Sequence, residues 1–149
     1  MQNGRRIAIK STEEGIVKTA TEALPARGDE TILVAEDDTA IRKLFSIVLE
    51  AYGYKVILAE DGEDAIKKFM ENKDKIQLVM LDLIMPKKSG KEAYDEIIKL
   101  RPDMKTLFSS GYTADRIDKD NMLKEGFNFI MKPVSPKDLL KKTREVLDK

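Results

Sequence analysis

The sequence predicts an α/β fold in which five helices cover a parallel sheet of five strands. Two observations lead to this prediction. Short apolar segments recur between residues 31 and 131, and each is followed by a longer segment whose apolar residues repeat at helical spacing. Strands and helices that alternate in this way form βαβ units around a parallel sheet. The 149 residues suffice for one such domain and a short extension.

The apolar segments have the length of buried strands and are bounded by charged or turn residues. The third segment is almost continuously apolar, and Asp82 follows it directly, before Pro86 and Gly90. A strand that is buried on both faces of a sheet has this pattern. The expected strands are residues 32–35, 56–59, 77–81, 106–109 and 127–131.

Helix signals follow each of these strands. Asp38 or Thr39 is the expected N-cap of the first helix, and Gly53 stands where a C-terminal cap is favoured. The second helix is expected after Asp61-Gly62, and the fifth near Pro136. The residues expected on the buried helix faces are, helix by helix, Ile41, Leu44, Phe45, Val48 and Tyr52; Ala65, Ile66, Phe69 and Met70; Ala93, Ile97 and Leu100; Ile117, Met122 and Leu123; Leu139, Leu140, Thr143, Val146 and Leu147.

Five strands of this kind favour the flavodoxin-like doubly wound arrangement, with strand order 2-1-3-4-5 and right-handed crossovers. The order reverses between the first and third strands. Ligands bind such sheets at the carboxyl ends of the strands, next to this switch point. The residues that follow the strands are therefore the candidates for function.

The first 29 residues differ in character from the rest. Residues 6–10 could form a short strand, and a capping-box pattern at Ser11 and Glu14 precedes a helical repeat that Pro25 ends. Two interpretations stay open: a segment left from a longer parent chain, or a helix that docks on a partner. The domain itself is expected to span residues 30–149, with no output domain after it.

Composition excludes several classes of function. The chain has no cysteine and no histidine, which excludes disulfides, thiolate zinc sites, Ser-His-Asp catalysis and a phosphohistidine of its own. Basic and acidic residues number 27 each, so no global basic field favours nucleic acid. No apolar stretch approaches the roughly 20 residues of a membrane span, and no secretory signal is present. We expect a cytoplasmic protein without membrane contact.

Acidic residues gather at two of the expected strand ends. Glu36, Asp37 and Asp38 follow the first strand, and Asp82 follows the third, its neighbour across the switch point. The first three could simply be the acidic residues that favour a helix N-terminus, and for Asp38 a role as helix cap is as well supported as a role in the site. Facing carboxylates would repel one another without a cation, and Mg²⁺ prefers oxygen ligands. We expect a site with Asp37 and Asp82 as direct ligands, Glu36 through water, and the backbone carbonyl of Ile84.

Two further polar residues end the fourth and fifth strands. Ser110 could be part of a turn, but its hydroxyl would lie one strand from Asp82, where it could donate to a phosphoryl oxygen. Lys132 alone would be an ordinary surface lysine. Pro133 follows it, however, and a cis bond there would hold the lysine over the cleft. Phe129 is either core filler or a ring that moves between buried and exposed rotamers.

These residues together resemble the receiver domain of bacterial two-component systems, from about residue 30 to residue 147. The resemblance implies that Asp82 is the phosphoacceptor, that Glu36 and Asp37 serve Mg²⁺, and that Ser110 and Lys132 bind the phosphoryl group. It also implies that the domain catalyses its own phosphorylation and dephosphorylation. The matching segments are residues 32–38, 81–86, 109–112 and 131–133.

The expected mechanism is phosphoryl transfer from a phosphohistidine of a histidine kinase or histidine phosphotransfer protein to Asp82. Ser110 and Phe129 would then switch the face formed by the fourth strand, fourth helix and fifth strand. Phenylalanine stands where the family often has tyrosine, so a hydroxyl contact is lost there. Ile84 and Tyr112 would tune the entry of the hydrolytic water. We expect a monomer or weak dimer.

Residues 110–133 resemble most the receivers at the C-terminus of hybrid sensor histidine kinases, and the N-terminal extension could be the junction with such a kinase. Two other functions are considered. The first is a Mg²⁺-dependent phosphatase or phosphotransferase with an aspartate nucleophile, which would need a further acid or base and a cap over the substrate. The second is an interaction module whose acidic cluster is not phosphorylated.

Overall fold

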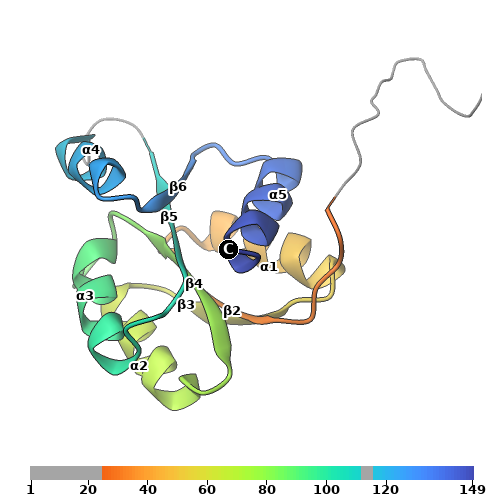
Figure 1. Ribbon diagram of the computed structural model, residues 1–149, viewed down its shortest axis with the longest axis horizontal. Helices are drawn as coiled ribbons and strands as arrows, with labels where there is room; N and C mark the ends of the chain where they lie inside the picture. The colour runs from red at the N-terminus through yellow and green to blue at the C-terminus, as the bar shows by residue number, and fades with distance from the viewer. Residues whose placement is uncertain (1–24, 112–115) are drawn as a thin grey trace, which may run out of the picture.

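The computed structural model describes residues 25–111 and 116–149. In this part of the chain a single parallel sheet has the order β3-β2-β4-β5-β6 (Figure 1). Counted along the chain, this is the predicted order 2-1-3-4-5, so the flavodoxin-like arrangement is confirmed. The strands are β2 (Thr31–Ala35), β3 (Lys55–Ala59), β4 (Ile76–Asp82), β5 (Thr106–Ser110) and β6 (Asn128–Met131).

Helices connect the strands, and polar side chains fix where most of them begin. Asp38, one of the two candidate caps, accepts a hydrogen bond from the amide of Ile41. Asp61, Ser89 and Ser135 cap the second, third and fifth helices in the same way, which satisfies amides that a helix leaves unpaired. The helices are α1 (Thr39–Ala51), α2 (Gly62–Asn72), α3 (Gly90–Leu100), α4 (Arg116–Lys124) and α5 (Pro136–Leu147).

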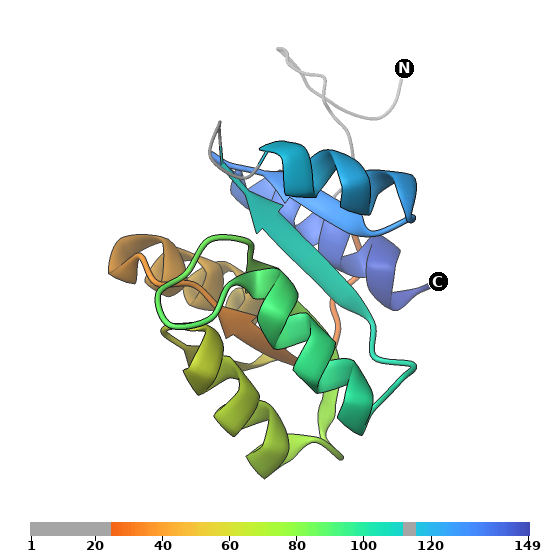
Figure 2. The same cartoon turned by 90° about the vertical axis from the view of Figure 1, so that its left-hand side faces the viewer.

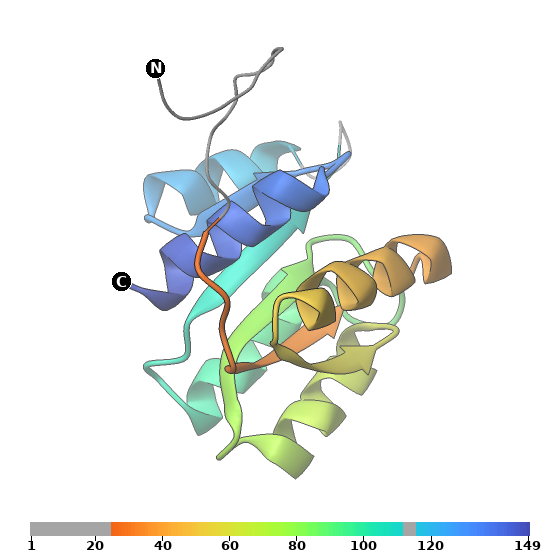
Figure 3. The same cartoon turned by 90° about the vertical axis from the view of Figure 1, so that its right-hand side faces the viewer.

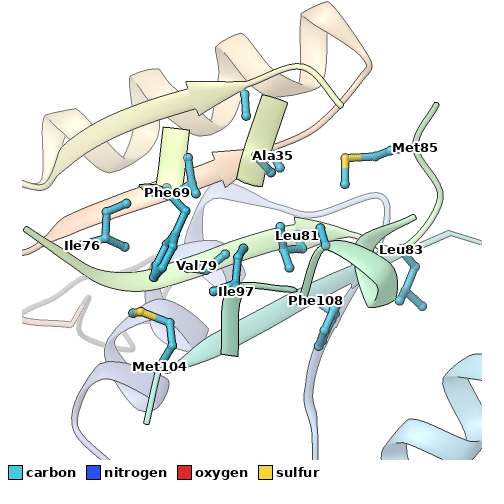
Figure 4. Close-up of a cluster of buried hydrophobic side chains, with 14 of the residues drawn as sticks. Ala35, Phe69, Ile76, Val79, Leu81, Leu83, Met85, Ile97, Met104 and Phe108 are labelled. Carbon is cyan, nitrogen blue, oxygen red and sulfur yellow. The ribbon is translucent and has the colours of Figure 1, made fainter. Parts of the chain in front are cut away.

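The helices form a layer on each face of the sheet. Helices α2, α3 and α4 lie on one face (Figure 2), and α1 and α5 lie on the other (Figure 3). Since successive residues of a strand point to opposite faces, each strand contributes to two cores. Ala35, Leu81 and Phe108 face α2 and α3 (Figure 4), whereas Ile32 and Met80 face α1 and α5.

Four residues expected on buried helix faces are exposed instead. Leu44, Met70 and Leu123 each lie directly beside a buried residue in the sequence, and consecutive helix positions lie about 100° apart. That rotation carries the neighbouring side chain out of the narrow buried stripe. Leu100 is the last residue of α3 and is 40% exposed. The prediction for Ile117 concerns a side chain outside the described part of the structure.

The strand expected at residues 6–10 and the helix after it also fall outside the described residues. The segment that enters β2 packs on the domain. The amide of Gly28 donates to the carbonyl of Tyr52 (3.0 Å), and the Arg27 guanidinium donates to the carbonyl of Ala51 (3.1 Å). Among the described helices, we find none with the length and apolar character needed to cross a membrane.

Candidate functional site: an acidic cluster at the carboxyl edge of the sheet

Three acidic residues between β2 and α1 have three different environments. Glu36 is buried, and its Oε2 accepts a hydrogen bond from the amide of Asp38 (3.0 Å). The Asp38 side chain is used as the helix cap, since its Oδ1 accepts from Ile41. Asp37 is exposed. Local hydrogen bonding thus fixes Glu36 in place and leaves the Asp37 carboxylate accessible.

Asp82 is the last residue of β4, the central strand of the sheet, and it is only 5% exposed. Because β2 pairs with β4 in parallel, with Ala35 opposite Leu81, the residues that follow both strands meet at the same edge. Carboxylate oxygens of Glu36, Asp37 and Asp82 lie within 4.8 Å of one another. The predicted convergence of these carboxylates is therefore observed.

Lys132 reaches this cluster from the end of β6. Its Nζ lies 2.9 Å from Asp82 Oδ2 and 2.7 Å from Glu36 Oε1. Its backbone amide donates to the carbonyl of Ser110 (2.8 Å), and the bond to Pro133 is cis. The lysine is therefore not an ordinary surface residue, because it forms ion pairs with two buried carboxylates.

Burial and charge together set the protonation of the cluster. Burial raises the pKa of Asp82 to about 7, with Glu36 adding to the rise and Lys132 opposing it. Burial lowers the pKa of Lys132, but hydrogen bonds to Glu36 and Asp82 outweigh this effect and leave it raised. The cluster thus contains three carboxylates and one ammonium group, which pairs with Glu36 and Asp82. A cluster of this kind, with oxygen ligands only, suits a hard divalent cation.

Ser110 ends β5 and is completely buried. Asp82 lies opposite Ser109 in the sheet register, so Ser110 is one residue farther toward the carboxyl edge. Its hydroxyl donates to the carbonyl of Gly111 (3.2 Å). The structure places Ser110 beside the strand of Asp82, and its contact with a phosphoryl group stays a prediction.

Phe129 lies on β6 and is half-buried, with its ring centroid 5.6 Å from that of Phe108. The rings of Tyr94 and Phe127 pack edge-on against Phe108 at 5.6 and 5.7 Å. This aromatic group fits core packing, and the switching role of Phe129 stays a prediction. Ile84, two residues after Asp82, is 50% exposed. Tyr112, the other predicted tuning residue, lies outside the described residues.

Sequence reasoning missed the contacts that hold the loop between Asp82 and α3. A Cβ on Gly62 would lie 2.0 Å from the carbonyl oxygen of Lys88, so this close approach requires glycine. Lys87 has a positive φ of 69°, and its Nζ lies 3.7 Å from Asp61 Oδ2. The Asp61-Gly62 pair signals a helix start in the sequence, but nothing there shows which loop it contacts.

Arg42 was also missed. Its guanidinium donates to the carbonyls of Glu36 (2.6 Å) and Asp37 (3.4 Å). An arginine one helical turn after the cap is the only signal for this contact, and it is a weak one because arginine is common in helices.

The fold and this site define a class of protein. A doubly wound α/β domain carries a buried aspartate at the end of its central strand, next to an acidic pair and a lysine. Residues 32–144 match the family described as "Response regulator receiver domain". This match covers more than half of the chain, and the chain belongs to the response regulator receiver family.

Relatives include sensor kinases. The chain is 32% identical to the sensor kinase CckA of Brucella abortus over 89% of its own length, and 38% identical to the CAI-1 autoinducer sensor kinase/phosphatase CqsS of Vibrio cholerae over 78%. It spans 14% and 17% of these proteins. The chain therefore corresponds to a small part of each.

Solved structures have the same fold. A response regulator receiver domain protein from Clostridium thermocellum is 30% identical, with a TM-score of 0.74 over 80% of this chain and 94% of that one. CheY of Borrelia burgdorferi, solved in a CheX-CheY-BeF3-Mg complex, is 26% identical, with a TM-score of 0.72 over 80% of this chain and 90% of that one.

Proposed function

We propose that Asp82 accepts a phosphoryl group from a phosphohistidine of a histidine kinase or a histidine phosphotransfer protein. The observation that carries this proposal is the position of Asp82. Its carboxylate is buried at the end of the central strand, 2.9 Å from Lys132 and within 4.8 Å of the acidic pair. A nucleophile so placed needs mainly positioning and charge neutralisation to receive a phosphoryl group.

Mg²⁺ is the cation that these oxygens fit. Asp37 and Asp82 would be direct ligands, with the backbone carbonyl of Ile84 as a third. Glu36 would act through water, because its Oε2 already accepts from Asp38 and its Oε1 lies beside Lys132. When bound, Mg²⁺ would neutralise charge on the phosphoryl oxygens. The relative from Borrelia burgdorferi was solved with both Mg and the BeF3 group.

The chain's own residues carry out the transfer. An Asp82 carboxylate oxygen forms a bond to phosphorus while the bond from phosphorus to the donor imidazole nitrogen breaks, and the electron pair returns to that nitrogen. The product is an acyl phosphate. Lys132, which already lies beside Asp82, pairs with the charge on the phosphoryl oxygens. The Ser110 hydroxyl donates a hydrogen bond to one of them.

The acyl phosphate then shifts the population of two states of the domain. Attraction of Ser110 toward the phosphoryl group makes room for Phe129 to turn inward, and the face formed by β5, α4 and β6 changes. Ile84 is exposed next to the site and, with Tyr112, sets how readily the hydrolytic water reaches the phosphoryl group. If substitutions of Ile84 and Tyr112 left the lifetime of the phosphoryl group on Asp82 unchanged from the wild type, the tuning role would be refuted.

The relatives point to a hybrid sensor kinase as the parent protein. The alignment with CckA covers 89% of this chain, more than residues 30–149 alone occupy, so it runs into the N-terminal extension. We therefore assign residues 1–29 to the junction with a preceding kinase region. The domain acts in the cytoplasm as a monomer or weak dimer, and it contacts neither nucleic acid nor membrane.

The test is to incubate the chain with acetyl phosphate and Mg²⁺ and to measure its intact mass. We expect an adduct of one phosphoryl group, lost in Asp82→Asn and retained in Asp61→Asn, which removes another nearly buried carboxylate. An adduct on Asp82→Asn would refute the assignment. No adduct on either chain would favour an unphosphorylated interaction module, and turnover of a small phosphate ester would favour a phosphatase.

A further inference from the structure

Arg42 holds the acidic loop from the side of helix α1. Its Nη1 donates to the carbonyl of Glu36 at 2.6 Å and to that of Asp37 at 3.4 Å. The side chain is half-buried, and its own amide donates to Asp38 within the first turn. A single guanidinium therefore contacts the backbone of Glu36 and Asp37, the two residues of this loop that are proposed to serve the metal.

The other contacts of this loop fix Glu36 and Asp38 more firmly than Asp37. The Glu36 amide donates to the carbonyl of Ala59 (3.1 Å), and its carboxylate accepts from the Asp38 amide. Asp38 is fixed as the cap of α1. Asp37 lies between them with an exposed side chain, and its carbonyl is where Arg42 makes its second contact.

We propose that Arg42 is a positioning residue for the cation site. It touches neither a ligand oxygen nor the reacting atoms. By donating to the Glu36 and Asp37 carbonyls, it fixes the backbone that aims the Asp37 carboxylate at Asp82. Groups that orient metal ligands in this way typically contribute about 10–100-fold to metal affinity. This inference rests on the metal site of the proposed function.

The positive charge of Arg42 has the opposite effect, because it repels a divalent cation. Because Arg42 is half-buried against the loop, ions in solution screen this repulsion only in part, so a net loss of affinity in Arg42→Ala requires the positioning effect to exceed it. Lys43 is the matched control. It is the next residue of the same helix, it carries the same charge, and it is exposed. Lys43→Ala removes charge without removing the loop contacts.

The experiment is a Mg²⁺ titration followed by amide NMR at a fixed pH of about 8, above the pKa of Asp82, which is about 7. We expect Arg42→Ala to weaken Mg²⁺ binding about tenfold. Lys43→Ala should change the affinity no more than about twofold. Arg42→Lys should lie between the wild type and Arg42→Ala, because it keeps the charge and one donor. Thermal unfolding confirms that each variant is folded.

A second readout needs no metal. Without Mg²⁺, amide hydrogen exchange of Asp37 and Asp38 should be faster in Arg42→Ala than in Lys43→Ala, because only the first variant frees the loop. Tighter Mg²⁺ binding by Arg42→Ala, or exchange equal to that of Lys43→Ala, would overturn the inference. Failure of the wild type to bind Mg²⁺ would overturn the proposed function with it. Wild-type binding with unchanged Arg42→Ala affinity would overturn this inference alone.

Discussion

Two charge clusters lie at opposite edges of the sheet, and they differ in how their charges are balanced. At the carboxyl edge, Lys132 lies between the buried carboxylates of Glu36 and Asp82. At the amino edge, the two guanidinium nitrogens of Arg144 lie 3.2 and 2.6 Å from the two oxygens of Glu30. Figure 3 shows the segment before β2 passing alongside α5, where this second pair forms.

The pKa shifts of the two clusters have opposite directions. The hydrogen bond from Arg144 lowers the pKa of Glu30, whereas burial raises the pKa of Asp82 to about 7. Both cations are shared, since Arg144 also lies 2.9 Å from Asp148, so the two edges differ in burial and in the number of hydrogen bonds. Glu30 is more exposed and accepts from two guanidinium nitrogens, which favours its charged form. Asp82 is almost fully buried, and burial outweighs its hydrogen bond to Lys132. The difference supports the proposal that the carboxyl-edge cluster receives a further cation, whereas the charges of the amino-edge cluster already stabilise one another.

Replacing Lys132, the ammonium group that Glu36 and Asp82 share, should have the largest effect on the stability of the domain. Lys132→Met leaves Glu36 and Asp82 buried and unpaired, and we expect the metal-free domain to lose about 3 kcal/mol of unfolding free energy. Mg²⁺ should restore part of this loss. Arg144→Met is the control, since Mg²⁺ should not restore the unfolding free energy that this variant loses. Urea denaturation with and without Mg²⁺ measures the unfolding free energy of both variants. If Mg²⁺ stabilised both variants equally, the proposed difference between the two edges would be contradicted.

Removing the negative charge of Asp82, which Lys132 only partly balances, should stabilise the metal-free domain. We expect Asp82→Asn to raise the unfolding free energy of the metal-free chain at pH 8 by about 1–2 kcal/mol. The raised pKa of Asp82 means that its charged form is disfavoured in the folded state. The gain should therefore be absent below pH 3.8, the ordinary value, and should grow as the pH rises to about 7. Urea denaturation across this pH range would contradict the account if the variant were less stable at pH 8.

The corresponding change at the amino edge should have the opposite sign. We expect Glu30→Gln to lower the unfolding free energy at pH 7 by about 1 kcal/mol, because it removes a partly buried two-pronged ion pair. Since the pKa of Glu30 lies below 4.5, the difference from the wild type should vanish as the pH falls through that lowered value. Phosphorylation by acetyl phosphate should be unchanged. Loss of phosphorylation would show that the two edges are not separate in function.

The smallest expected effect concerns backbone strain at the carboxyl edge. Among the described residues, Lys87 is the one non-glycine residue with a positive φ. Lys87→Gly should raise the unfolding free energy by about 0.5 kcal/mol, because glycine relieves that strain while losing more chain entropy. Its ion pair with Asp61 is long, at 3.7 Å, and the lysine side chain is exposed, so its loss costs little. A clear destabilisation would mean that this contact holds the loop.

The sequence predicted the sheet order and the meeting of Asp82, Glu36 and Lys132, because the carboxyl ends of parallel strands share one edge. It also predicted where α1, α2 and α5 begin, because the residues that signal these starts lie at or next to the first turn of each helix. The pair of Glu30 and Arg144 could not be predicted. These residues lie 114 positions apart, and the spacing of charged residues along the sequence does not indicate which of them form ion pairs in the fold.

Helix faces were predicted less well than helix positions. Leu44 and Met70 are apolar and stand at helical spacing, but each lies beside a residue that fills the buried stripe better. The width of that stripe depends on how closely a helix approaches the sheet, which a single sequence does not encode. The positive φ of Lys87 was hidden for a similar reason, because lysine gives no sign of the loop conformation that it adopts.

The most direct test of the contrast between the two edges is a carbon-detected NMR titration of the Asp82 and Glu30 carboxyl groups in the metal-free chain. The account predicts a midpoint near 7 for Asp82 and one below 4.5 for Glu30, with Mg²⁺ lowering only the first. An Asp82 midpoint at or below 3.8, or one that Mg²⁺ leaves unchanged, would contradict it.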